Sequence, residues 1–336
     1  MSRIIFYPSG TRELPSSHLR VYEVADELQA LGHSVVIVDP SLGDKDKRVF
    51  LELASSGTIV YIQKIMQSFH KVQNFLPFKN KFKLVYDVDD WGEERDRDMM
   101  EMAHIVVAGS HYIHDYAKQQ NPNVHIALSI TDTQVYHLVD RSTKSPDAPV
   151  QIIWTESFAN AFWEDLGMIA GPMKKMYEKY KVRFVLQGLR ENRHMSNKRY
   201  HNLLYKFIRF FPYCIVQKFM PIDQYLTKGV QTILDSDIGV IPFKPERVGK
   251  AGQNMRSFMS AGLGVIGTPN NEHDYLIEHG QTGFLATTEQ EWEVALETLI
   301  SNRQLRLEMG QKASHLVQRK YGRKQYMKNI QTILGI

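Results

Sequence analysis

The chain has 336 residues, of which 43% are hydrophobic and 23% charged, and its formal net charge is +4. These values are typical of a soluble globular protein with two domains of ordinary size, and they exclude a disordered or fibrous chain. A single cysteine, Cys214, excludes a disulfide framework and a cysteine-rich metal site. The mild basic charge is compatible with an anionic nucleotide, a membrane surface or nucleic acid, and it does not choose among them.

Short apolar runs alternate with amphipathic helical patterns through the first half of the chain. The helix expected at 17–31 places Val21, Val24 and Leu28 on one face, and Gly32 ends it. This alternation is typical of a parallel sheet in the α/β class. We expect strands at 3–7, 34–38, 58–62, 84–86, 105–108 and 124–128, and a further helix at 111–119 with Ser110 as its N-cap.

The first residues lead directly into a strand, so we expect no secretory signal, and no apolar run has the length of a membrane span. The expected location is therefore the cytoplasm, with the inner face of a membrane left open. Residues 67–83 bear on this second option because they mix aromatic residues with lysines. Such a stretch suits an anionic membrane or a nucleic-acid backbone, but it also suits a helix packed on the sheet with its lysines in solvent.

Three carboxylates, those of Asp87, Asp89 and Asp90, stand at the carboxyl end of a predicted strand. Active sites of parallel sheets are built at that edge. Like charges this close resist joint ionisation unless a cation or hydrogen-bond donors neutralise them. Two interpretations follow: the carboxylates belong to a functional site, or they cap the following turn.

The second half of the chain repeats the alternation of strand and helix. A polar segment with two prolines, residues 140–149, precedes it and is the expected linker between domains. We expect strands at 150–154, 183–187, 215–218, 238–241 and 265–267, and helices at 168–180, 221–234, 254–261, 289–300, 304–321 and 324–333.

The most informative stretch is residues 235–286. After the strand at 238–241, a polar loop carries Lys250, Gly252 and Gln253. Asn254 is expected to cap the next helix, and Gly262 to end it in a left-handed conformation. A helix N-terminus beside a lysine suits a phosphate or diphosphate, although an ordinary βαβ unit with a flexible loop fits the same residues.

Two runs within this stretch carry a resemblance to a known family. They read MSAGLGVIGT from Met259 and YLIEHGQTGFL from Tyr275. The region 257–285 resembles the donor-binding half of the group 1 glycosyltransferases. The resemblance implies the GT-B architecture, an α/β fold of two Rossmann-like domains with a deep cleft between them. The implied parts are an acceptor domain at 1–145, a donor domain at 150–320, and a last helix within 321–336 that crosses back to the first domain.

The chain departs from the family pattern at several positions. Family members often carry two glutamates seven residues apart, and these positions are Gly249 and Ser257 here, with Glu246 nearby but out of register. Gly264 replaces the usual proline. The glutamates' roles in binding the donor therefore do not carry over. The loop after the strand at 150–154 also lacks the family's two basic residues.

A polar loop at 188–194 contains candidate substitutes for those basic residues, Arg190 and Arg193. We assign to the donor site Gly10, Arg20, Gln187, Arg190, Lys250, Gly252, Gln253, Asn254 and Ser257.

The loop before the first helix often faces the cleft in this family, with a sequence similar to Ser16, Ser17 and Arg20 here. Without the resemblance, Ser17 reads as a helix cap and Arg20 as a solvent residue. We assign to the acceptor site Ser16, Ser17, His18, Asp87, Asp90 and His111.

The expected catalytic residues are Asp89, which falls near a cleft histidine of the family, and Lys250. Asp-x-Asp is also the metal motif of the other glycosyltransferase architecture. That fold does not carry the pattern of 257–285, so we assign no metal ligand and expect no cofactor.

These assignments predict an enzyme that transfers a sugar from a nucleotide-diphosphate sugar to an acceptor, with retention at the anomeric carbon. The acceptor is left open between a surface glycan, a lipid-linked sugar and a modified base in DNA, as in phage enzymes. Peripheral membrane contact through residues 67–83 is also left open. The alternatives are a non-catalytic GT-B protein that binds a nucleotide sugar or a partner enzyme, and a sugar-nucleotide epimerase.

Overall fold

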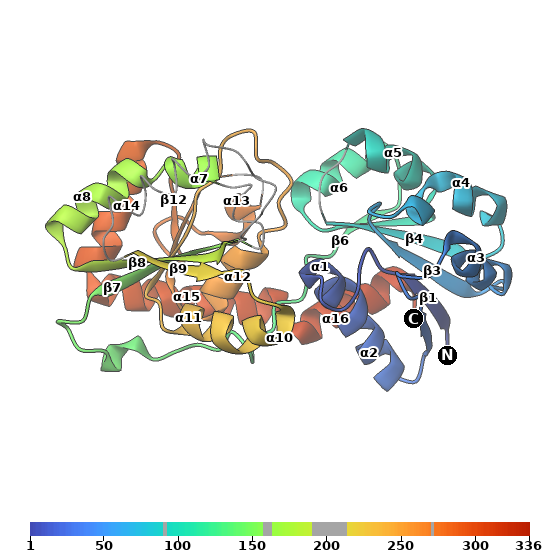
Figure 1. Cartoon of the computed structure of the whole chain (residues 1–336), viewed down its shortest axis with the longest axis horizontal. Coiled ribbons are helices and arrows are strands. Elements are labelled where there is room, and N and C mark those ends of the chain that lie inside the picture. The colour runs from blue at the N-terminus through green and yellow to red at the C-terminus, as the bar shows by residue number, and fades with distance from the viewer. Residues whose placement is uncertain (90–92, 157–162, 190–213, 270–271) are drawn as a thin grey trace. The chain divides into compact units, whose positions relative to one another are not determined.

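A computed structural model of the chain describes residues 1–89, 93–156, 163–189, 214–269 and 272–336 (Figure 1). The chain divides into two compact units. The first comprises residues 1–130, 249–251 and 323–336, and the second comprises 131–248 and 252–322. The second unit therefore begins at Thr131, earlier than the start at 150 that the sequence suggested.

The first unit is built on a sheet of six parallel strands. Its order is β2-β1-β3-β4-β5-β6, so the chain first moves outward from β1 and then continues on the other side of it. The strands are β1 Arg3–Tyr7, β2 Ser34–Ile37, β3 Thr58–Gln63, β4 Lys83–Val88, β5 Ile105–Ala108 and β6 Val124–Ile126.

Alternate residues of these strands bury two separate cores, one on each face of the sheet. On β1, Ile5 and Tyr7 belong to one core, whereas Ile4 and Phe6 belong to the other. This is the period of two that a buried strand requires. Helical segments cover the two faces: α1 Pro15–Ser17, the π-helix η1 His18–Tyr22, α2 Glu23–Ala30, α3 Asp44–Glu52, η2 Ser68–His70, α4 Val72–Phe75, η3 Leu76–Phe78, α5 Glu93–Met102, α6 His111–Ala117 and α16 Arg323–Leu334.

The second unit holds another sheet of six parallel strands. Its order is β12-β11-β10-β7-β8-β9, with the change of direction between β7 and β10. The strands are β7 Val150–Thr155, β8 Val182–Leu189, β9 Cys214–Lys218, β10 Ile238–Ile241, β11 Gly264–Gly267 and β12 Phe284–Leu285. The helical segments are η4 Arg141–Thr143, α7 Trp163–Gly167, α8 Ala170–Lys179, α10 Ile222–Gln224, η6 Tyr225–Gly229, α11 Val230–Leu234, α12 Gln253–Ser260, α13 His273–Leu276, α14 Glu289–Ser301 and α15 Arg303–Tyr321.

The segment expected to be a linker, residues 140–149, is anchored to the second unit. Arg141 is buried and donates to the carbonyl groups of Ser236, at 2.5 Å, Leu234 and Ala261. The segment predicted as the linker therefore lies within the second unit, where a buried arginine with satisfied donors fixes its backbone.

The last helix, α16, completes a core of the first unit. Tyr326, Ile330 and Ile333 join the face that contains Ile4 and Phe6. Asn329 donates to the Ile126 carbonyl at 2.8 Å, which ties α16 to β6. Among the described residues, no helix combines the length and apolar character needed to cross a bilayer.

Candidate functional site

Each sheet has one point where the strand order reverses. In the first unit it lies between β1 and β3, and in the second it lies between β7 and β10. Ligands of open parallel sheets bind outside the carboxyl ends of the strands at such points. The residues at these two carboxyl edges are therefore the candidates for a site.

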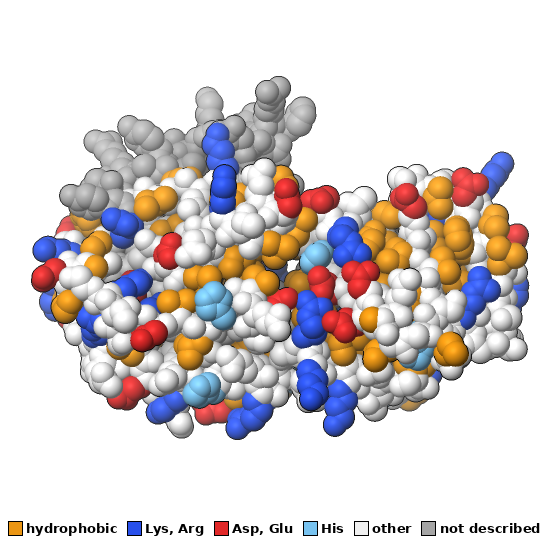
Figure 2. Space-filling model, turned by 90° about the horizontal axis from the view of Figure 1, so that it is seen from below, with side chains coloured by type: hydrophobic (Ala, Val, Ile, Leu, Met, Phe, Trp, Pro, Cys, Tyr) orange, Lys and Arg blue, Asp and Glu red, His pale blue; other side chains and the backbone are white. Residues whose placement is uncertain are grey.

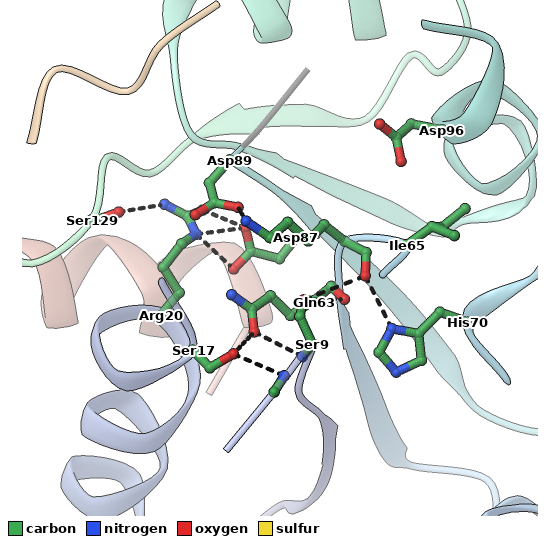
Figure 3. A network of polar contacts seen from close by, with 12 residues as sticks. Ser9, Ser17, Arg20, Gln63, Ile65, His70, Asp87, Asp89, Asp96 and Ser129 are labelled. Carbon is green, nitrogen blue, oxygen red and sulfur yellow. Dashed lines mark hydrogen bonds and ion pairs between the residues drawn. The ribbon is translucent and has the colours of Figure 1, made fainter. Parts of the chain in front are cut away.

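At the first edge, Gln63 ties the loop after β1 to the helix that follows it (Figure 3). Its Oε1 accepts from the backbone N–H of Ser9 at 3.0 Å and from the Ser17 hydroxyl at 2.7 Å. The Ser17 Oγ accepts in turn from the N–H of Gly10 at 3.1 Å. Ser17 is the N-cap residue of η1, but its side chain makes no cap hydrogen bond. The buried hydroxyl joins the loop after β1 to Gln63 instead.

Arg20 and Asp87 form a buried ion pair beside Gln63 (Figure 3). Both side chains are fully buried, and the Arg20 Nε lies 2.9 Å from the Asp87 Oδ1. Arg20 also donates to the Ala127 carbonyl, and the Tyr61 hydroxyl donates to Asp87 at 2.6 Å. The expectation that Arg20 contacts the donor is corrected here: it has no exposed surface and serves to hold Asp87.

The ionisation of this cluster is set by burial. Burial raises the pKa of the Asp87 carboxyl, and the paired Arg20 guanidinium opposes that shift. Burial also raises the pKa of the Tyr61 hydroxyl well above its ordinary value. Tyr61 therefore stays protonated and available as the donor to Asp87.

Asp89 is the next carboxylate on β4's carboxyl side and pairs with a second cation. The Lys64 Nζ lies 3.0 Å from the Asp89 Oδ1, and both side chains are nearly buried. The absence of a side chain at Gly109 lets its backbone approach Asp89 closely, because a Cβ at Gly109 would lie 2.7 Å from the Asp89 Cα. The two carboxylates that suggested a metal motif each face a cationic side chain, which neutralises them as the proximity of like charges demands.

The other residues predicted in the first unit lie around this network. The N–H of Gly10 donates to Ser17, and Ser16 is half-buried. The His18 Nε2 lies 3.1 Å from the Glu23 carboxylate. His111 is half-buried at the start of α6, where the Ser110 hydroxyl caps the helix as predicted. Asp90 lies outside the described residues.

At the second edge, neutral side chains join the ends of three strands. The Thr155 hydroxyl donates to the Gln187 Oε1 at 2.9 Å. The Gln187 Nε2 donates to the Gln217 Oε1 at 2.9 Å and to the Gly229 carbonyl at 3.0 Å. Gln187 is almost fully buried, so it holds β7, β8 and β9 in register instead of reaching a ligand directly.

The helix α12 begins at this edge with its first turn uncapped by any side chain. Gly252, its N-cap, has φ +62°, and a Cβ there would lie 2.8 Å from the Glu272 Cγ. The prediction that Asn254 caps the helix was wrong: it lies inside the first turn, and its Nδ2 donates to the Thr155 carbonyl at 2.9 Å. An uncapped helix N-terminus presents backbone N–H groups and a partial positive charge.

A buried pair, Arg256 and Glu272, stands beside that N-terminus. Their charged atoms are 3.9 Å apart, and both side chains are essentially unexposed. Arg256 also donates to the Thr131 hydroxyl at 3.2 Å and to the Gln253 Oε1 at 2.8 Å. The pair fixes the first turn of α12 against the start of the unit.

Lys250 and Ser257 are the remaining residues predicted for the donor site, and Lys250 belongs to the short segment 249–251 of the first unit. Lys250 is half-buried, two residues before Gly252. Ser257 is buried within α12, so no carboxylate occupies the position where the family often has its second glutamate. Gln253 opens α12. Arg190 lies outside the described residues.

Sequence reasoning missed four residues of these edges, which are Gln63, Lys64, Thr155 and Glu272. Gln63 and Thr155 each end a strand, and Lys64 directly follows one. Polar residues at those positions were a usable signal, because the carboxyl ends of parallel strands meet at one edge. Nothing local marked Glu272, whose partner lies on another element.

No protein-family model matches the chain, and no curated protein matches it in sequence. Solved structures match it throughout. HepE of Anabaena, in complex with UDP and glucose, covers 100% of both chains with a TM-score of 0.73 at 14% identity. Sucrose-phosphate synthase of Thermosynechococcus elongatus matches 99% of this chain and 98% of its own, with a TM-score of 0.75 at 12% identity.

A glycosyltransferase of Rickettsia africae matches over the same shares, with a TM-score of 0.72 at 12% identity. At these identities the likeness concerns the fold. The predicted α/β class with two Rossmann-like units is confirmed, and the chain has the GT-B fold.

Proposed function

We propose that the protein is a glycosyltransferase that uses a nucleoside-diphosphate sugar as its donor. The observation that carries the proposal is the uncapped N-terminus of α12 at the reversal point of the second sheet. The shared fold supports it, because the solved structures that match include glycosyltransferases. As HepE was solved with UDP and with UDP-glucose, these are the first ligands to test here.

The chemistry follows from the charge that develops during transfer. As the bond from sugar to diphosphate breaks, negative charge builds on the leaving phosphate, and groups aimed at it stabilise the transition state. Backbone N–H groups at a helix N-terminus do this without a rearrangement of charge. Lys250, two residues ahead of the N-cap Gly252, would add a full positive charge, and we assign the diphosphate to these groups.

The donor assignment is tested by ligand-induced stabilisation. A thermal-shift screen with UDP, GDP, CMP, ADP and TDP and their sugars, with and without EDTA, should give a shift for one base. Lys250→Ala should weaken diphosphate binding by about 1.5–3 kcal/mol, the range of a charge-assisted hydrogen bond. Lys312→Ala, an exposed lysine of α15, is the matched control. Nucleotide affinity unchanged in Lys250→Ala would remove Lys250 from the site.

In the first unit we assign the acceptor to the edge that holds Asp89. The Lys64 ammonium lies 3.0 Å from this carboxylate, and a positioned carboxylate is one of the groups that act as a general base. Asp89→Asn should lower transfer and leave donor affinity nearly intact. Equal loss of both would place Asp89 in donor binding or in folding.

Retention at the anomeric carbon, independence from metal and the class of acceptor are further parts of the proposal. Residues 67–83 contribute an exposed Leu76 near Lys79, while Phe69 and Phe75 are buried. On the face shown in Figure 2, basic and acidic side chains are mixed, and this favours a glycan or lipid-linked acceptor over DNA. Flotation of the protein with anionic liposomes would support the lipid-linked acceptor. DNA binding that falls steeply with added salt would support DNA as the acceptor.

A second candidate is a protein that binds a nucleotide sugar without turnover. It is favoured by Ser257, which leaves the family's glutamate position without a carboxylate. Donor binding without hydrolysis or transfer to any offered acceptor would support this second candidate over the first.

A further inference from the structure

A cavity of about 510 Å³ opens at the opposite end of the second sheet, among residues that the proposed transfer does not use. It lies at the amino ends of β7, β8 and β9, beside α11 and the segment 144–149. Its wall includes Lys144, Gln151, Arg183, Ile215, Gln217 and Asp237.

The walls of this cavity are fixed by hydrogen bonds. The Arg303 Nη2 donates to the carbonyl groups of Ser142, at 2.8 Å, and Lys144, at 2.6 Å, which holds the segment before β7. The Lys144 Nζ reaches across to the Asp235 carbonyl at 2.6 Å and thereby joins that segment to the end of α11. A site with these supports is largely formed before any ligand binds.

The cavity wall carries two cations, Lys144 and Arg183, and two carboxylates, Asp235 and Asp237. The Lys144 Nζ lies 2.8 Å from the Asp237 Oδ1, and the Asp237 Oδ2 accepts from the N–H of Gln151 at 2.9 Å. Asp235 is engaged with Gln231. Within the described part of the chain, the exposed Arg183 guanidinium forms no ion pair or hydrogen bond. A negative group on a ligand would find its partner there.

The other residues that line the cavity suit a ligand with many hydroxyl groups. The Gln217 Nε2 donates to the Thr232 hydroxyl at 2.9 Å, and the Gln151 Nε2 donates to the Ser236 hydroxyl at 3.1 Å. Each amide keeps a second N–H for another partner. Val185 forms an apolar floor and Ile215 an exposed apolar rim, against which the C–H face of a sugar ring packs.

We propose that this cavity is an ancillary binding site for a sugar that carries one anionic group, either a sugar acid or a sugar phosphate. The guanidinium fork of Arg183 matches both a planar carboxylate and a phosphate. The volume is within the range of small-molecule pockets. The groups assigned to the diphosphate, Lys250 and the first turn of α12, are not in the cavity wall. Gln217 lies in that wall and also accepts from Gln187 at the carboxyl edge.

The test is titration of the intact protein with glucuronate and with glucose 6-phosphate, followed by calorimetry, with glucose as the neutral control. We expect saturable binding of at least one anionic sugar and much weaker binding of glucose. The anionic sugar that binds more tightly shows whether the site prefers a carboxylate or a phosphate. Arg183→Gln should weaken binding by about tenfold or more, whereas Lys181→Gln, an exposed lysine just before β8, should leave it unchanged.

Ile215→Trp gives a second test that keeps every charge. The larger side chain at the exposed rim should block the cavity and abolish binding, while UDP still produces its thermal shift. The proposal is overturned if neither anionic sugar binds, if Arg183→Gln binds as well as the parent, or if UDP displaces the anionic sugar.

Discussion

The two units use the reversal points of their sheets in different chemical ways. At the first, Arg20, Asp87, Lys64 and Asp89 are buried charges that pair with one another. At the second, the strand ends are joined by neutral groups such as Gln187, and the half-buried N-terminus of α12 has no side-chain cap. The charges of the first edge are paired with one another within the protein. The helix N-terminus at the second edge carries a partial positive charge and has no side-chain cap.

This difference indicates which kind of group is better suited to bind a negatively charged ligand. Buried ionised side chains require partners because an isolated charge is strongly destabilised in a protein interior. Backbone N–H groups at a helix terminus need no counter-ion in the empty site. We therefore expect mutations of the buried Arg20–Asp87 pair to act mainly on stability, and mutations at the second edge to act on nucleotide binding.

The largest expected effect comes from breaking the buried pair of the first edge. Arg20→Leu leaves the Asp87 carboxylate buried without its cation and should lower the free energy of unfolding by about 3–5 kcal/mol. Urea unfolding measures it. The double variant Arg20→Leu with Asp87→Leu should recover much of the loss. A loss below about 1 kcal/mol in the single variant would contradict a buried, obligatory pair.

Gln187 provides the matching test at the second edge. Gln187→Leu removes three hydrogen bonds and leaves the Gly229 carbonyl and the Thr155 hydroxyl without this partner. We expect a loss of about 1–3 kcal/mol in unfolding free energy, together with weaker UDP binding. Gln231→Leu, an exposed amide on α11, is the control. If Gln187→Leu binds UDP unchanged, the second edge does not hold the nucleotide.

One buried histidine in each unit allows a comparison by pH. Burial lowers the pKa of His70 and of His273 from 6.5 to about 4. As the pH falls, these histidines are protonated in the unfolded chain before they are protonated in the folded chain. Their contribution to the free energy of unfolding is therefore fully present above pH 6.5 and is lost as the pH drops from 6.5 towards 4. Each histidine should contribute a loss of about 2 kcal/mol near pH 5.

The measurement is unfolding free energy from pH 7 to 4.5 for His70→Gln, His273→Gln and the parent. Each variant should show a shallower acid dependence than the parent. A parent whose stability is flat across this window would show that the histidines are not buried in their neutral form.

The smallest effect is expected from an exposed pair on the first unit. Arg12 and Asp26 lie 2.9 Å apart with side chains 47% and 53% exposed. Arg12→Gln should change stability by less than about 1 kcal/mol, and less still in high salt. An effect as large as that of Arg20→Leu would show that burial does not explain the contrast between the two pairs.

Much of the fold could be predicted because strand patterns and helix signals are local. The strand at 105–108, the Ser110 cap and the left-handed Gly262, at φ +76°, were all confirmed. The failures concern partners that are distant in sequence. Asn254 has the right chemistry for a cap, yet its amide is drawn to the Thr155 carbonyl on another strand.

Arg20 shows both the limit and the missed signal. Its partner, Asp87, lies 67 residues away, and no local pattern names that pair. However, Arg20 precedes Val24 and Leu28 by four and eight residues, so all three share one helix face. An arginine on an apolar face predicts a buried counter-ion, and a carboxylate at the end of a strand was the available candidate.

The position of α16 also constrains how the polypeptide acquires its structure during translation. Tyr326, Ile330 and Ile333 belong to a core of the first unit, although the ribosome makes them after all of residues 131–322. That core stays incomplete, with apolar surface on β1 and β3 uncovered, until the whole second unit has emerged. The second unit has its segments nearly contiguous and is free to fold first, so the order of folding should run opposite to the order of synthesis.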